Sequence, residues 1–277
     1  MTKNNRTATL LLSCKDKKGL VAAISQFVFE QNGNIVHSDQ HTDPEQGMFI
    51  MRIEWELEGF KIPKEKLAEA FAPVAKKFEM NWELKFSDTV PKMGIMVSKY
   101  DHCLYDLLLR KISGELEVEV PVIISNHDDL KPVADSFNVP FKVFRKDKNN
   151  KLEQEKNELH EFEKNKVDFI VLARYMQIIS PVIISKYPNK IINIHHSFLP
   201  AFSGPKPYHN AYERGVKIIG ATSHFITEEL DAGPIIAQEV AKVSHRDHVD
   251  DLIRQGKDLE RLVLARAVRL YLQNRIL

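Results

Sequence analysis

The residues whose types and spacing could carry out chemistry lie in one stretch, residues 191–233. Asn193 and His195 close the apolar run IINIH and are two residues apart, so in a strand both side chains point to the same face. An amide beside an imidazole on a rigid element suits the stabilisation of a developing oxyanion. A lone Asn-x-His pair is more often a local backbone cap beside a satisfied buried histidine, so the pair alone leaves a structural role open.

The second half of this stretch adds an acidic group. In IIGATSHFI, His224 shares a strand face with Thr222, and the loop TEELDAGP follows. Asp231, followed by two small residues, is the predicted buried carboxylate, whereas Glu228 and Glu229 are predicted to be solvated. A carboxylate near a histidine can fix its tautomer, favour its charged form or take a proton from water. We therefore expect Asp231 to act with the histidines.

The elements that position these residues belong to an α/β domain. From about Pro91, short apolar runs typical of parallel strands covered on both faces alternate with amphipathic helices. The runs are MGIMVS, VEVPVIIS, PFKVF, DFIVLA and KIINI, and the helices are predicted at 101–113, 128–137 and 150–164. This alternation predicts a doubly wound, mostly parallel sheet. A final helix pair is predicted from about Val249 to Leu272, and the charged run 146–166 is predicted to be a solvated helix.

The N-terminal part has a different pattern. Strands are predicted at 7–13, 35–43, 47–57 and 81–87, and helices at 20–31 and 63–78. This is a ferredoxin-like βαββαβ unit, in which the alternation of Phe49, Met51, Ile53 and Trp55 predicts one wet sheet face. We therefore expect an α/β protein with an N-terminal domain at 1–87, a linker at 88–92 and a catalytic domain at 93–277.

Composition excludes several classes of protein. The 277 residues hold 39 basic and 38 acidic side chains, a net charge of +1, so no nucleic-acid or membrane-surface partner is expected. The apolar runs are far shorter than the roughly 20 residues of a membrane span. The N-terminus has no signal-peptide pattern, and two distant cysteines fit a reducing cytoplasm.

The order of the N-terminal elements, with the turn DKKGL and the strand entry GNI, resembles the ACT domain family. The resemblance implies a small amino-acid effector, glycine or methionine, bound near Asp16, Gly19, Asn34 and Ile35, often across a dimer interface. It also implies a homo-oligomer. A domain that serves only for oligomer packing remains the alternative.

The motifs N-I-H-x-S-x-L-P (193–200) and G-A-T-x-H-x-[IV]-T-x-x-L-D-x-G-P (220–234) resemble the formyltransferase-fold family that uses 10-formyltetrahydrofolate. The resemblance implies a Rossmann-like variant with Asn193, His195 and Asp231 as the catalytic trio and His224 in support. LARYMQIIS (172–180) resembles the family's pterin-pocket segment, which makes Met176, Gln177 and Ile179 candidates for folate contact. For Ile179 a place in the core remains equally open.

One departure from the transformylase pattern bears on the acceptor. Those relatives hold a substrate phosphate on a glycine-rich loop after the first strand, whereas here VSKYDHCLYDLL has no glycine between Gly94 and Gly114. The tRNA-acting relatives carry a further C-terminal domain, which this sequence is not expected to have. Water is then the remaining nucleophile, and the whole chain resembles the formyltetrahydrofolate deformylase family. That resemblance implies hydrolysis of 10-formyltetrahydrofolate, as substrate, to formate and tetrahydrofolate, with no cofactor and no metal.

Further roles and alternatives stay open. His196 could help to select water over an amine or be a neutral surface side chain, and Ser197 could bind the water or cap its own loop. Cys103 has no visible activating partner. Three other functions remain as alternatives: a formyltransferase to an amine, a silent amino-acid sensor, and a metal-dependent amidohydrolase using His195, His196, His209 and His224.

Overall fold

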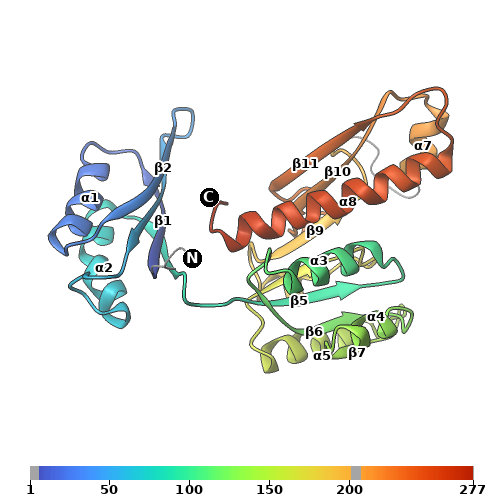
Figure 1. The fold of residues 1–277 in the computed structure, drawn as a ribbon, viewed down its shortest axis with the longest axis horizontal. Helices are drawn as coiled ribbons and strands as arrows, with labels where there is room; N and C mark the ends of the chain where they lie inside the picture. Colours follow the sequence, from blue (N-terminus) through green and yellow to red (C-terminus); the bar gives the residue numbers. More distant parts are fainter. Residues whose placement is uncertain (1–5, 201–206, 277) are drawn as a thin grey trace. The chain divides into compact units, whose positions relative to one another are not determined.

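The structure, a computed structural model, describes residues 6–200 and 207–276. It divides into two compact units. One unit comprises the described residues up to Val90 together with those from Gln273 onward, and the other is Pro91–Leu272 (Figure 1). The chain therefore crosses between the units twice, at Val90 and at the end of the last helix.

The first unit is the expected ferredoxin-like fold. Its elements are β1 (Thr7–Lys15), α1 (Leu20–Glu30), β2 (Ile35–Asp43), β3 (Met48–Glu56), a 3-10 turn (Lys64–Lys66), α2 (Leu67–Phe78) and β4 (Asn81–Phe86). The strands lie in the order β2-β3-β1-β4, and each neighbouring pair is antiparallel. The βαββαβ prediction is confirmed.

The alternation along β3 has one exception. Phe49, Met51, Ile53 and Trp55 are buried in the core as predicted. Arg52, on the face expected to be wet, is also buried, because it pairs with Glu54 and donates from Nε to the backbone carbonyl of Asn274 at 3.0 Å. The prediction of a wet face is therefore wrong at Arg52, where the last residues of the chain cover the sheet.

The second unit is built on a seven-stranded sheet. Its first half holds β5 (Lys92–Val97), α3 (His102–Ile112), β6 (Glu119–Ser125), α4 (Lys131–Ser136), β7 (Phe141–Val143), α5 (Lys151–Lys164) and β8 (Phe169–Leu172). It continues with α6 (Pro181–Ile184), β9 (Ile191–His195), α7 (Pro207–Glu213), β10 (Ile218–Phe225), β11 (Ile235–Lys242) and α8 (Val249–Leu272). The order is β11-β10-β9-β8-β5-β6-β7; β5 to β9 run parallel, and β10 runs antiparallel to both of its neighbours, β9 and β11. The doubly wound, mostly parallel sheet is confirmed.

Helices cover both faces of this sheet. Phe162 of α5 packs with Met96 and Ile170 on one face, and Tyr271 of α8 packs against Phe169 on the other, with 4.6 Å between the ring centres. α8 lies along β9, β10 and β11 (Figure 1). The chain reverses its direction of winding between β5 and β8, so the carboxyl ends of these strands mark the crevice where such sheets bind ligands.

Two sequence predictions in this unit are wrong. The expected final helix pair is one continuous helix, α8, and Gly256 inside it packs against Tyr208, whose ring would lie 2.2 Å from a Cβ at that position. The charged run is not simply solvated, because Glu155 and Glu158 of α5 are fully buried. β11 has no counterpart among the predicted strands.

Candidate active site

Two strand ends bring the first candidate residues together. β9 and β10 pair antiparallel, with Asn193 opposite His224 and His195 opposite Thr222. Since cross-strand partners and alternate residues share a face, all four side chains lie on the same side of the sheet. The Nδ2 atom of Asn193 lies 3.2 Å from Nε2 of His224. The sequence predicted from strand spacing that the side chains at the ends of these two strands converge, and the register of β9 against β10 brings them together.

The ring of His224 is held in one orientation. Its Nδ1 lies 2.9 Å from the carbonyl oxygen of Phe225, which only accepts, so Nδ1 carries the proton. In the neutral ring Nε2 then accepts from Nδ2 of Asn193 and thereby fixes the orientation of that amide. His224 is fully buried and positions Asn193 from behind.

Asp231 reaches the histidines from a tight loop. The backbone N–H of Phe225 donates to the carbonyl of Pro234 at 2.9 Å and closes the loop between them. Gly233 allows this closure, because a Cβ there would lie 1.8 Å from the Phe225 oxygen. Asp231 has φ of 54°, in the left-handed region, where the short polar side chains of Asp and Asn are tolerated.

The loop places the Asp231 carboxylate between two imidazoles. Oδ2 lies 3.4 Å from Nδ1 of His195, and Oδ1 lies 3.6 Å from Nε2 of His224. His195 holds the pKa of Asp231 well below its usual range despite partial burial. Asp231 is therefore ionised, and the carboxylate favours a proton on Nδ1 of His195. The Nε2 atom of His195 is buried and has no hydrogen-bond partner among the described residues.

The loop after His195 is fixed by Thr222. The hydroxyl of Thr222 donates to the carbonyl of Ser197 at 2.9 Å and accepts from the backbone N–H of Leu199 at 3.0 Å. Ser197 is buried and does not line the cavity described below, so the structure gives it a place in the loop. His196 does line the cavity, and burial lowers its pKa to about 4, with the positive charge of Arg174 adding to the effect.

A cavity of about 510 Å³ opens in front of these residues. Asn193, His195, His196 and Asp231 line it together with the segment after β8. Met176, Gln177 and Ile179 all lie on its wall, together with Ile178, which the sequence interpretation omitted. Ile179 is 6% exposed and also belongs to the core, whereas Met176 is 51% exposed. The volume lies within the usual range for a small-molecule site.

One wall of the cavity is a polar cluster that sequence reasoning missed. The Glu260 carboxylate, buried on α8, accepts from the Tyr208 hydroxyl at 2.7 Å and lies 2.7 Å from Nε2 of His102 and 3.4 Å from Nε of Arg174. Burial opposes ionisation of Glu260, but His102 and Arg174 outweigh it and lower its pKa. His102 is the first residue of α3, in the segment without glycines that follows β5. Arg174 could have been found from the sequence, because ligands bind at the carboxyl ends of parallel strands and Arg174 follows β8. Glu260, an acidic residue inside α8, gave no such signal.

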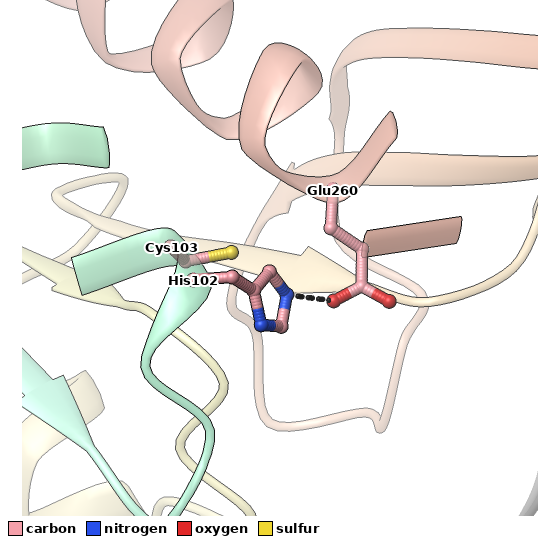
Figure 2. A group of neighbouring side chains, drawn as sticks. All are labelled: His102, Cys103 and Glu260. Carbon is pink, nitrogen blue, oxygen red and sulfur yellow. Dashed lines mark hydrogen bonds and ion pairs between the residues drawn. The ribbon is translucent and has the colours of Figure 1, made fainter. Parts of the chain in front are cut away.

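The same cluster includes a possible ligand set. The ligand atoms of His102, Cys103 and Glu260 lie within 4.8 Å of one another (Figure 2). A guanidinium already faces the Glu260 carboxylate, and burial, followed by the charge of Glu260, raises the pKa of the Cys103 thiol. Both effects disfavour a cation. Within the described ranges this is the one such group, so the four histidines weighed as a metal site do not form one.

A second buried network supports the wall formed by residues 174–180. The Lys146 ammonium lies 2.8 Å from Glu158 and 3.6 Å from Glu155, and all three side chains are at most 2% exposed. Glu158 accepts from the Tyr175 hydroxyl at 3.1 Å, and Glu155 accepts from the Ser180 hydroxyl. These contacts tie α5 to the cavity wall.

The candidate effector residues in the first unit do not come together within one chain. Asp16 follows the end of β1 that pairs with Met48, whereas Ile35 pairs with Trp55 at the opposite end of β3. Gly19, with φ of 92°, immediately precedes α1 on the same side as Asp16, and Asn34 lies beside Ile35 and donates to Glu56. The four residues therefore mark two places on the sheet.

None of the helices in the described residues has the length and apolar character needed to cross a bilayer.

The chain is similar to known proteins along its full length. The formyl transferase family model matches residues 92–268, and the ACT domain model matches residues 8–72. The chain is 55% identical to a formyltetrahydrofolate deformylase of Synechocystis, an alignment that covers 99% of the chain and 96% of the relative. It is 48% identical to one of Bacillus subtilis, covering 99% and 92%.

A solved structure agrees. The crystal structure of a formyltetrahydrofolate deformylase from Pseudomonas syringae pv. tomato superimposes with a TM-score of 0.97 at 42% identity, covering 100% of this chain and 93% of that one. The sequence motifs, the two-unit fold and these similarities lead to one conclusion: the chain belongs to the formyltetrahydrofolate deformylase family.

Proposed function

We propose that this chain hydrolyses 10-formyltetrahydrofolate to formate and tetrahydrofolate. One observation carries the proposal: His195, paired through Nδ1 with the ionised Asp231, presents a buried and unpaired Nε2 at a cavity that Asn193 also lines. A base oriented by a carboxylate, next to an amide donor, is what attack of water on a formyl carbon requires.

The geometry supports a role for each residue. Asp231, with its lowered pKa, is a weak base, which favours proton transfer through His195 over direct transfer to Asp231. Nε2 of His195 takes a proton from water as the oxygen attacks the formyl carbon. Asn193, whose amide His224 orients, donates to the developing oxyanion. The protonated His195 then gives its proton to N10, and the C–N10 bond breaks.

The experiment is hydrolysis by Asp231→Asn, with no amine acceptor present, followed by the appearance of both tetrahydrofolate and formate. The left-handed backbone at Asp231 tolerates Asn, so the fold should be kept. Loss of the tautomer-fixing charge should lower kcat on the order of 10²–10⁴-fold. Glu229→Gln, which removes an exposed carboxyl from the same loop, is the control. Near-full hydrolysis by Asp231→Asn would refute the assignment.

Two further properties follow from the same proposal. Hydrolysis uses no bound cofactor or metal, so activity should survive exhaustive chelation. The formyltransferase alternative requires an amine, so steady formate release without one would exclude it as the main activity. We place the enzyme in the cytoplasm, because a reducing compartment keeps cysteines such as Cys14 and Cys103 unpaired.

We also propose that the unit matched by the ACT model is regulatory and that the chain forms a homo-oligomer. β2 is an edge strand that is exposed from Ile35 to Thr42, which favours pairing with another copy. A second copy could also bring Asp16 and Gly19 near Asn34 and Ile35 of the first. The test is turnover with and without glycine or methionine. If neither changes kcat or KM, the effector assignment falls, whereas hydrolysis stands or falls separately.

A further inference from the structure

Arg174 has a backbone conformation that its side chain does not favour. It follows β8 at the carboxyl end of a central strand, and its φ is 64°. The left-handed region is unfavourable for a residue with a side chain other than Asn or Asp. Such strain persists where the surrounding structure requires it and clusters at binding and catalytic sites. An arginine, in place of a residue that fits this conformation freely, indicates that its side chain is needed there.

The guanidinium of Arg174 is buried and is held by two contacts. The residue is 8% exposed, its Cζ lies 4.8 Å from the ring centre of Tyr100, and its Nε lies 3.4 Å from Glu260. Nη1 is buried and has no hydrogen-bond partner among the described residues. Since an unpaired buried N–H is costly, Nη1 is suited to an acceptor that enters from the cavity, which Arg174 lines.

Glu260 does not supply that acceptor. Its two oxygens are engaged by Tyr208 and His102, each at 2.7 Å, and no hydrogen bond joins it to Nη1 of Arg174. The ligand must therefore be small, must accept a hydrogen bond and, facing a guanidinium, is favoured if it is an anion.

We propose that Arg174 binds the product formate through Nη1. The proposal rests on the proposed function and deepens it. In the reaction, the oxygen of water bonds to the formyl carbon, the C–N10 bond breaks, N10 takes one proton, and the formic acid loses the other to become formate. The ionised Asp231 repels the new anion, and the positive charge of Arg174 offers it a place on the same cavity wall.

A carboxylate could also come from the glutamate tail of the folate. The burial of Arg174, which is 8% exposed, favours the one-carbon anion, because a small ligand fits beside a buried guanidinium more readily than a long tail. Substitution of Arg174 distinguishes the two sources. It lowers the affinity for formate if Arg174 binds the one-carbon anion, and it raises KM for the folate if Arg174 binds the tail.

The test measures binding of 13C-formate by NMR line broadening and product inhibition by sodium formate at constant ionic strength. Arg174→Gly removes the guanidinium and relieves the backbone strain, so the fold should be kept. We expect at least a tenfold loss of formate affinity with KM for 10-formyltetrahydrofolate within about twofold of the wild type. Lys257→Gln, which removes another cation that lines the cavity, is the charge-matched control and should retain formate affinity.

A second variant works in the opposite direction. Glu260→Gln keeps the shape of the wall but removes the charge that opposes an anion, so formate should bind several-fold more tightly. Weaker formate binding in Glu260→Gln, or an equal loss in Lys257→Gln, would overturn the proposal, as would wild-type affinity in Arg174→Gly. A raised KM with unchanged formate affinity would assign Arg174 to the folate tail instead. Because formate binding by NMR needs no turnover, a failure of this proposal can be told apart from a failure of the proposed hydrolysis.

Discussion

Lys146→Met tests the buried network that supports the cavity wall. In the wild type one ammonium faces two carboxylates, Glu158 at 2.8 Å and Glu155 at 3.6 Å, and none of the three side chains is more than 2% exposed. Removing the single cation leaves two acids buried without it. Breaking a buried ion pair in this way destabilises a fold by about 3–5 kcal/mol.

The expected shift in melting temperature follows from the size of the unit. Pro91–Leu272 is about 180 residues, and unfolding entropy of about 2.1 cal/mol/K per residue gives about 0.4 kcal/mol/K. The loss should therefore lower the Tm of this unit by about 8–13 °C. Because Tyr175 and Ser180 donate to these two acids, the variant should also raise KM for the folate as residues 174–180 loosen.

The assay has an internal control. Both tryptophans, Trp55 and Trp82, lie in the first unit, so calorimetry reports on both units while tryptophan fluorescence follows the first alone. The calorimetric transition of the second unit should move and the fluorescence transition should move less. Lys156→Met, on the exposed face of α5, is the matched variant and should shift Tm little. Equal shifts for the two lysine variants would refute the reasoning.

The loss of stability caused by Lys146→Met should depend on pH. Burial raises the pKa of Glu158 above its value in the unfolded chain, and Lys146 opposes this. A group with a raised folded pKa stabilises the fold at low pH and loses that contribution as pH rises through the folded value. Without Lys146 the pKa rises further, so the destabilisation should be larger at pH 8 than at pH 5. A deficit that grows on acidification would contradict this account.

Three other predictions concern the site. Gly256→Ala should lower Tm and kcat, since its Cβ would lie 2.2 Å from the Tyr208 ring. Thermal unfolding measures the first effect and an activity assay the second, and an unchanged Tm would refute the contact. Thr222→Val removes an acceptor from the buried Leu199 N–H and should cost about 1–3 kcal/mol, measured by denaturant unfolding, whereas Thr222→Ser should restore most of it. His196 has a pKa lowered to about 4, so it destabilises the fold as pH falls from about 6.5 to 4. In His196→Asn the stability–pH curve should be flatter over that range, and an unchanged curve would refute the shift.

The sequence by itself determined much of this protein. Period-two and helical patterns predicted both folds because each element buries its own apolar face, as the β3 residues Met51 and Ile53 do. Strand spacing put Asn193 and His195 on one face, and the small residues after Asp231 indicated a turn. These properties depend on residues that are close together in the sequence, so the sequence alone predicts them.

Only the tertiary structure decided which distant residues meet. Glu260 looks like one more charge on a helix until α8 places it against Tyr208, His102 and Arg174. Glu158 likewise looks solvated until Lys146 covers it. Burial of a charge depends on partners brought from other elements, and partner positions depend on strand order and helix packing. No short window of sequence contains that information, so the cavity wall had to be read from the fold.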